Sequence, residues 1–152
     1  MRILGIDYGD KRIGVAISDP LGIMAQGIAM IGKGETFEPD IREIKRLIKK
    51  YDGVEEIVVG LPKTMAGEIG VQAEKVMTFV NELKKEFKIN IVTWDERLTT
   101  IEAERGLIEA GLSREKRKKV IDKTAAAAIL QSYLDRKKRC NSGQEGDGDY
   151  GC

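Results

Sequence analysis

Four acidic residues stand beside apolar stretches that could form strands or helices, and their side chains could do chemistry if the fold brings them together. They are Asp7, Asp95, Glu96 and Asp122. Carboxylates that crowd together repel one another, which raises one pKa or requires a bound cation. Hard oxygen ligands favour Mg²⁺ or Mn²⁺, and two such ions can activate a water and stabilise the leaving oxygen of a phosphodiester.

The chain contains no histidine. Catalysis by histidine is therefore excluded, as are the common zinc sites that contain it. Acid–base or metal chemistry must rest on carboxylates or on Lys, Tyr, Ser and Thr. The two cysteines, Cys140 and Cys152, bracket a Gly-rich tail and form neither a disulfide framework nor a metal-ligand set.

Each of the four acids also has a purely structural interpretation. Asp7 could cap the turn before Gly9. Asp95 could be a helix N-cap, and Glu96 could lie in the first turn of that helix and compensate its dipole. Asp122 could do the same for the last helix. Spacing alone leaves these alternatives open.

The elements that must position these acids begin with three short strand-like runs separated by turn residues: Arg2–Asp7, Arg12–Ser18 and Ile23–Ile31. The gaps of four residues are too short for a crossover, so these strands should form an antiparallel meander. Apolar periodicity then predicts a helix over about 37–48, a strand at 56–60, a helix over about 71–87, a strand at 89–94, and helices near 99–110 and 120–138.

This order predicts an α/β domain with a mixed five-stranded sheet, in which the three-strand meander joins two parallel strands and helices flank the sheet. Ligands gather at the carboxyl ends of parallel strands. Asp7 ends the first strand and Glu96 follows the fifth, so they should approach each other at one edge, and Asp122 could project over it from the last helix. We expect one domain over 1–139 and a disordered, acidic, Gly-rich tail over 140–152.

Charge is distributed unevenly along a chain of net charge +1. The tail contributes −3, so residues 1–139 carry +4, with basic clusters at 114–119 and 136–139. This suits a polyanion partner, although solvated helix faces would have the same composition. No apolar run is long enough to cross a bilayer, and Asp7 interrupts the N-terminal apolar stretch, unlike in a signal peptide, so we expect a cytoplasmic protein.

Four ordered motifs resemble those of the YqgF/RuvX family, RNase H-like relatives of the Holliday-junction resolvase RuvC. They are Gly5–Ala16 (GIDYGDKRIGVA), Val59–Pro62 (VGLP) with Gly67, Asp95–Thr100 (DERLTT) with Glu102 and Ala103, and Asp122–Ala126 (DKTAA). The resemblance spans about residues 1–138. It implies an RNase H-like fold and a metal-dependent nuclease that processes the end of pre-16S ribosomal RNA. Holliday-junction resolution and non-catalytic nucleic-acid binding are the alternatives.

The resemblance implies that Asp7, Glu96 and Asp122 are the catalytic, metal-binding carboxylates. Sites of the RuvC type use four acids, and the candidates for the fourth are Asp95 and, in the first turn, Asp10. The opening hairpin also resembles the first phosphate loop of actin-fold sugar kinases, but 152 residues leave no room for their second lobe.

Basic residues near these acids are the candidates for substrate contacts. Lys11 and Arg12 either hold a phosphate or are simply exposed, and Arg97 either bonds the scissile phosphate or pairs with Asp95. The basic cluster would add phosphate contacts through Arg114, Lys116, Arg117, Lys118 and Lys119. We expect the partner to be RNA, with branched DNA as the alternative. We expect a monomer rather than a dimer, because paired cuts in a junction need a dimer and no dimer element is evident.

Overall fold

The computed structural model describes residues 1–63, 69–97 and 124–141, without the side chains of the last two. Several predicted features therefore lie outside the described residues. They are the helix near 99–110, the first residues of the helix over 120–138, Asp122, the basic cluster at 114–119 and the tail from 142 onward.

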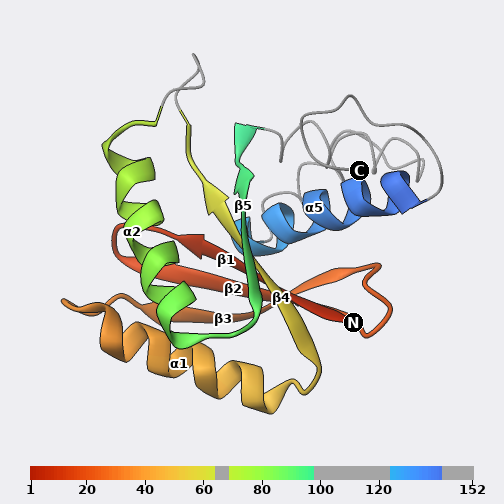
Figure 1. Ribbon diagram of the computed structural model, residues 1–152, viewed down its shortest axis with the longest axis horizontal. Coiled ribbons are helices and arrows are strands. Elements are labelled where there is room, and N and C mark those ends of the chain that lie inside the picture. Colours follow the sequence, from red (N-terminus) through yellow and green to blue (C-terminus); the bar gives the residue numbers. More distant parts are fainter. Residues whose placement is uncertain (64–68, 98–123, 142–152) are drawn as a thin grey trace.

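Five strands form one mixed sheet, as predicted (Figure 1). They are β1 (Arg2–Tyr8), β2 (Arg12–Ser18), β3 (Ala25–Gly32), β4 (Val54–Leu61) and β5 (Asn90–Asp95). Their order across the sheet is β3-β2-β1-β4-β5. The pairs β1–β2 and β2–β3 are antiparallel, whereas β1–β4 and β4–β5 are parallel. The first strand is thus central, and its carboxyl end lies beside that of β4.

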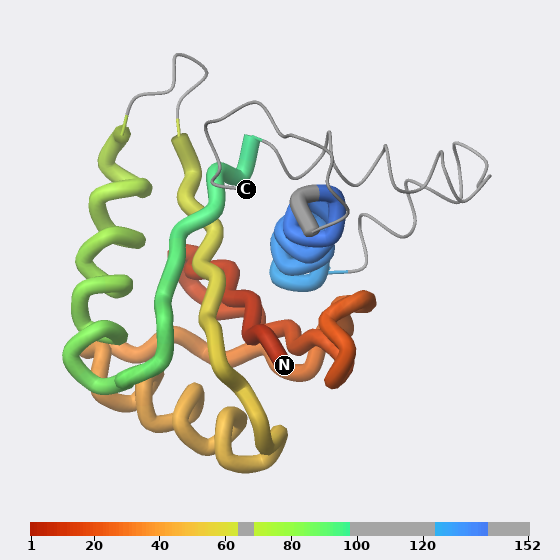
Figure 2. The backbone as a smooth tube through the Cα atoms, turned by 45° about the vertical axis from the view of Figure 1, so that its right-hand side comes forward, coloured from red at the N-terminus to blue at the C-terminus, as the bar shows by residue number. Residues whose placement is uncertain are grey.

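Helices cover both faces of this sheet. They are α1 (Phe37–Lys50), α2 (Val71–Glu86) and α5 (Ala125–Asn141). Figure 2 shows α5 on one side of the sheet and α1 and α2 on the other. One core cluster joins α1 and α2 to side chains such as Ile6 and Val59, and a second joins α5 to Ile3, Val58 and Trp94. No described helix is long and apolar enough to span a membrane.

Glycines in four adjacent strands make room for α5 and for Thr124, the residue before it. They are Gly5 of β1, Gly14 of β2, Gly27 of β3 and Gly60 of β4. A Cβ added to Gly5 would lie 2.7 Å from Cβ of Leu130, closer than real side chains approach. A Cβ added to Gly14 would lie 3.3 Å from Cβ of Ala126. Because small residues let the helix approach the sheet closely, the first turn of α5 lies against β2 and against β1, the strand that carries Asp7.

Candidate active site

Asp7 lies near the end of β1, on the sheet face that α5 covers. It pairs with Gly14 of β2, and a Cβ at position 14 would lie 3.7 Å from Cβ of Asp7. The side chain is half-buried, and this burial raises the pKa of the carboxyl above its ordinary value. The charged form of Asp7 is therefore disfavoured, because burial removes water from its carboxylate.

Glu96 follows β5 directly and extends its pairing with β4, since its N–H donates to the Leu61 carbonyl at 3.1 Å. Its side chain crosses over β4 at Gly60, where an added Cβ would lie 2.7 Å from Oε1 and 3.2 Å from Cγ of Glu96. Burial, followed by the negative charges of Asp7 and Asp95, raises the pKa of Glu96 to about 7. Glu96 is thus the most strongly perturbed carboxyl of this edge.

The two acids converge because the strand between them carries a glycine. Ile6 is in register with Val59, which places Asp7 beside the Gly60 end of β4. The Glu96 carboxylate leans over Gly60 toward the same place, and Asp7 raises the pKa of Glu96 through charge repulsion. The structure therefore brings Asp7 and Glu96 together on the α5 face, at the carboxyl ends of the strands.

The chemistry of this pair fits a divalent cation. No ion pair among the described residues involves Asp7 or Glu96, so no Lys or Arg there neutralises them. Burial and repulsion both disfavour the paired anions, and a bound cation would relieve both effects. Within the described residues no group of three or more candidate ligands comes together. The third ligand that the resemblance implies, Asp122, lies outside the described residues.

Asp95 is paired with Arg97 and not with the two converging acids. Its side chain is 2% exposed, and its Oδ2 accepts from a terminal guanidinium nitrogen of Arg97 at 2.6 Å. Oδ1 also accepts the Arg97 backbone N–H at 3.0 Å. These bonds lower the pKa of Asp95, and the charge of Lys63 lowers it further. The ion pair with Asp95, which was the structural alternative for Arg97, is thus present, and Asp95 is a poor candidate for a fourth metal ligand because Arg97 occupies its oxygens.

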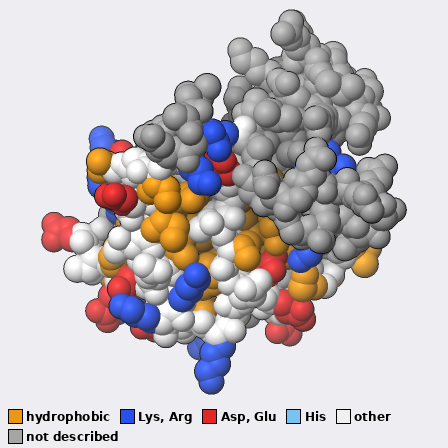
Figure 3. Space-filling view, turned by 45° about the horizontal axis from the view of Figure 1, so that its top comes forward, with side chains coloured by type: hydrophobic (Ala, Val, Ile, Leu, Met, Phe, Trp, Pro, Cys, Tyr) orange, Lys and Arg blue, Asp and Glu red, His pale blue; other side chains and the backbone are white. Residues whose placement is uncertain are grey.

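The remaining predicted contact residues divide between the exposed surface and the undescribed part of the chain. Lys11 and Arg12 are exposed at the β1–β2 turn, as is Asp10. The five residues of the basic cluster lie outside the described residues. Figure 3 shows Lys and Arg side chains gathered around an acidic one at the end of the molecule where β4 and β5 finish.

No individual role was predicted from the sequence for Gly60 or Lys63, although both act on the acids of this edge. A glycine inside an otherwise apolar strand is a signal of close approach by another group, so Gly60 was detectable. Lys63 follows Pro62 at the end of β4 and its charge acts on Asp95. No local pattern distinguishes Lys63 from other surface lysines.

A family model described as "RuvX: Holliday junction resolvase" matches residues 1–136. A protein of Desulforamulus reducens named "Putative pre-16S rRNA nuclease" is 55% identical over 135 residues, which cover 89% of this chain and 97% of that protein. In structure, the chain is similar to RuvC of T. thermophilus in complex with a Holliday junction substrate, with a TM-score of 0.60 and 11% identity over 92% of this chain and 96% of that one. This likeness confirms the predicted RNase H-like fold.

A second likeness in fold is to a ROK hexokinase from Thermus thermophilus. The TM-score is 0.51 at 17% identity, over 70% of this chain but only 38% of that one. The shared part is less than two fifths of that kinase. This likeness concerns the fold alone.

Proposed function

This chain belongs to the RuvX family, and from that premise we propose that it is a metal-dependent nuclease that hydrolyses a phosphodiester at the end of pre-16S ribosomal RNA. The observation that carries the proposal is the convergence of Asp7 and Glu96 across Gly60. Two unneutralised carboxylates at the carboxyl edge of a sheet are suited to a hard cation. The name of the 55% identical relative supports the RNA substrate.

Asp7 and Glu96, with Asp122 as the third ligand, would hold one or two Mg²⁺ or Mn²⁺ ions. Bound there, such ions supply a water activated for attack and charge stabilisation of the leaving oxygen. Gly60 leaves the space through which Glu96 reaches its partner. The Asp95 carboxylate accepts hydrogen bonds from the Arg97 backbone N–H and from the Arg97 guanidinium, so that Arg97 can bond the scissile phosphate from a preset position.

A cleavage panel tests this function. Purified protein would be incubated with single-stranded RNA, RNA duplex, RNA/DNA hybrid and a four-way DNA junction, with Mg²⁺, with Mn²⁺ and with EDTA. We expect cleavage of RNA that requires either metal and is abolished by EDTA. Metal-independent cleavage, or binding without cleavage under all conditions, would contradict the proposal, the second outcome indicating a non-catalytic binding module.

Junction resolution is the second candidate function, because the matching family model carries that description. It differs in what it demands of the molecule. A resolvase makes paired cuts and needs two active sites related by symmetry. Mass measurement in solution, together with the junction arm of the panel, separates it from RNA processing.

A further inference from the structure

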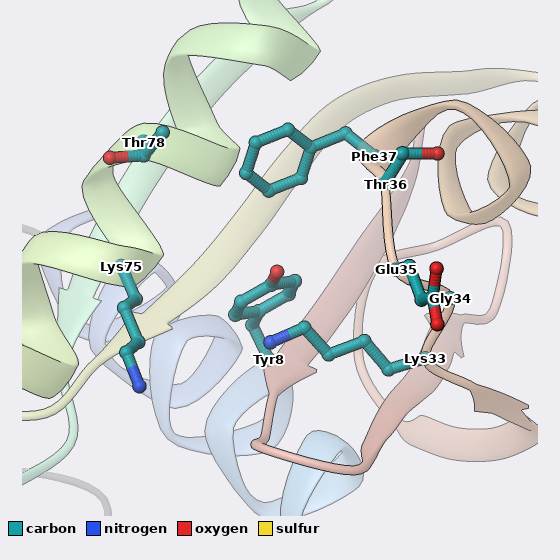
Figure 4. A pocket seen from close by; sticks show the side chains of 8 residues that line it. All are labelled: Tyr8, Lys33, Gly34, Glu35, Thr36, Phe37, Lys75 and Thr78. Carbon is teal, nitrogen blue, oxygen red and sulfur yellow. The ribbon is translucent and has the colours of Figure 1, made fainter.

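On the opposite side of β1 from Asp7, the fold forms a hollow of about 270 Å³ between the end of β1, the segment that precedes α1, and α2 (Figure 4). Successive side chains of a strand point to opposite faces, so Asp7 faces α5 and Tyr8 faces this hollow. The Tyr8 ring stacks on Phe79 with centroids 4.3 Å apart, and Phe37 lies beside Phe79 at 6.2 Å. Tyr8 and Phe37 therefore form the aromatic floor of the hollow, and the buried Phe79 lies beneath them.

Two ammonium groups border this floor. Lys33 Nζ lies 4.4 Å from the centroid of the Tyr8 ring, and Lys75 extends from α2 on the other side of the ring (Figure 4). Among the described residues, neither lysine has a carboxylate within ion-pair distance. Glu35 also lines the hollow, but Figure 4 shows its carboxylate directed away from both lysines. The positive charge here is thus available to an anion.

The hollow is joined to the acid site by a short basic stretch. The exposed Lys11 and Arg12 lie in and just after the turn that follows Tyr8. The backbone N–H of Lys33 donates to the Lys11 carbonyl at 3.0 Å, so the turn and the hollow are in direct contact. A polyanionic strand whose phosphate lies at Asp7 and Glu96 can reach the hollow by passing over this turn, which carries the exposed Lys11 and Arg12 as well as the exposed Asp10.

We propose that the hollow formed by Tyr8, Lys33 and Lys75 is a subsite for a nucleotide that flanks the cleavage position. The phosphate of this nucleotide would lie between the two lysines, and its sugar or base would lie against the aromatic floor. This inference rests on the proposed function for its substrate class. Ammonium groups at an aromatic surface are the combination that binds single-stranded nucleic acid with little sequence preference. The subsite would orient the strand relative to the acids without taking part in bond cleavage.

The test uses an RNA-binding readout that does not depend on cleavage. In the full-length Asp7→Asn background, the double variant Lys33→Gln/Lys75→Gln is compared with Lys49→Gln/Lys84→Gln, which removes two exposed lysines elsewhere on α1 and α2. Affinity for a labelled single-stranded RNA of mixed sequence is measured over a range of salt. We expect the slope of log affinity against log salt to fall by about 0.7 per lost phosphate contact in the first variant and to stay unchanged in the second.

Lysine footprinting locates the contact. Acetylation of the same Asp7→Asn protein with and without the RNA, followed by mass spectrometry, should show protection of Lys33 and Lys75 and none of Lys49 and Lys84. Equal labelling of Lys33 and Lys75 in free and RNA-bound protein, or equal salt slopes for the two double variants, would overturn the subsite. Protection without any cleavage by the unmodified protein would support the subsite and contradict the proposed nuclease activity instead.

Discussion

The carboxylate of Glu96 lies directly over Gly60, so close that a Cβ at position 60 would sit 2.7 Å from its Oε1. The same added atom would lie 2.5 Å from Cδ1 of Ile129 on α5. In β4, which lies between β5 and β1, Gly60 thus leaves a space that the side chains of Glu96 and of Ile129 on α5 share. This space decides whether Glu96 can reach Asp7.

Gly60→Ala should therefore impair both stability and cleavage. The added methyl group must displace Ile129, Glu96 or both, and overpacking of this kind costs about 1–3 kcal/mol. We expect a lower Tm, and a reduced cleavage rate at saturating metal because Glu96 is moved from its partner. Thermal melts and single-turnover cleavage check the two effects.

Gly32→Ala is the matched control, since a Cβ there meets nothing within 4 Å. It should leave both Tm and rate close to those of the unmodified protein. If Gly60→Ala behaved like Gly32→Ala, the space at Gly60 would have no importance for the site.

Asp7→Asn should abolish cleavage while the fold stays intact. The amide keeps the size of the side chain but removes a half-buried negative charge, which lowers its value as a metal ligand and relieves repulsion with Glu96. Tm without metal should hold or rise. Asp52→Asn removes a charge from the exposed turn between α1 and β4 and should retain activity. Cleavage by purified Asp7→Asn protein at the unmodified rate would end the carboxylate–metal proposal.

The raised pKa of Glu96 predicts a pH-dependent stability in metal-free protein. Its pKa is about 7 in the folded state against an ordinary value of 4.5, so the unfolded chain loses the proton at lower pH than the folded one. The Glu96 contribution therefore disfavours folding progressively as pH rises from about 4.5 to about 7, and the full penalty is present above that.

Glu96→Gln should remove this penalty. In EDTA, the Tm gain of the variant over the unmodified protein should be larger at pH 8 than at pH 5. Mg²⁺ should stabilise the unmodified protein at pH 8, and this stabilisation should fade as pH drops through about 7, because protons compete for the same carboxylate. An equal Tm difference at both pH values would show that Glu96 is not perturbed by burial and by Asp7.

Arg97 should contribute to the cleavage rate more than to binding. Asp95 holds its guanidinium through several bonds, and a preset cation is most useful where charge develops at the scissile phosphate. Arg97→Lys keeps the charge but loses the fork geometry. We expect a lower single-turnover rate at saturating RNA with a nearly unchanged Kd. Arg42→Lys, at an exposed pair with Glu38, is the control. A change in Kd alone would assign Arg97 to binding.

Much of this arrangement could be predicted from local patterns. Four-residue turns dictate the antiparallel meander, and apolar periodicity separates the helices from the strands. Together they predicted the mixed sheet, with Asp7 at the end of its central strand and Glu96 near Asp7. The choice between two partners for Arg97 could not be made, because both the phosphate and Asp95 satisfy the same charge. The structure shows the ion pair with Asp95, because that carboxylate is buried and needs a cation, and the phosphate contact proposed for Arg97 would be made in addition to it.

The hollow at Tyr8 was beyond sequence reasoning for a different reason. Its side chains come from three distant segments, at Tyr8, Lys33 and Lys75, and each alone is an ordinary surface or core residue. Nothing in the pattern of any one segment indicates the others. Only the pairing of β1 with its neighbours and the packing of α2 on the sheet bring these residues together.

The basic cluster should contribute to RNA binding rather than to cleavage. It consists of Arg114, Lys116, Arg117, Lys118 and Lys119. If these residues contact phosphates, replacing all five with Gln should weaken binding to RNA of any sequence. The salt dependence should flatten by about 0.7 per lost contact on a single strand, because fewer counterions are released. Single-turnover cleavage at saturating RNA should remain nearly intact, since the acids and Arg97 are untouched. The contrast with Arg97→Lys, which lowers rate and spares binding, separates capture of the strand from chemistry on it.

The unmodified protein should prefer RNA with single-stranded character to a four-way DNA junction, and it should sediment as a monomer. A chain with one active site cannot make the paired, symmetric cuts that resolve a junction, so preference and mass must agree with each other. The decisive measurement sets cleavage rates on both substrates beside the mass in solution, at one salt concentration, because affinities at different salt are not comparable. A stable dimer that cuts junctions symmetrically and leaves RNA untouched would replace RNA processing by junction resolution, with the same carboxylates at work.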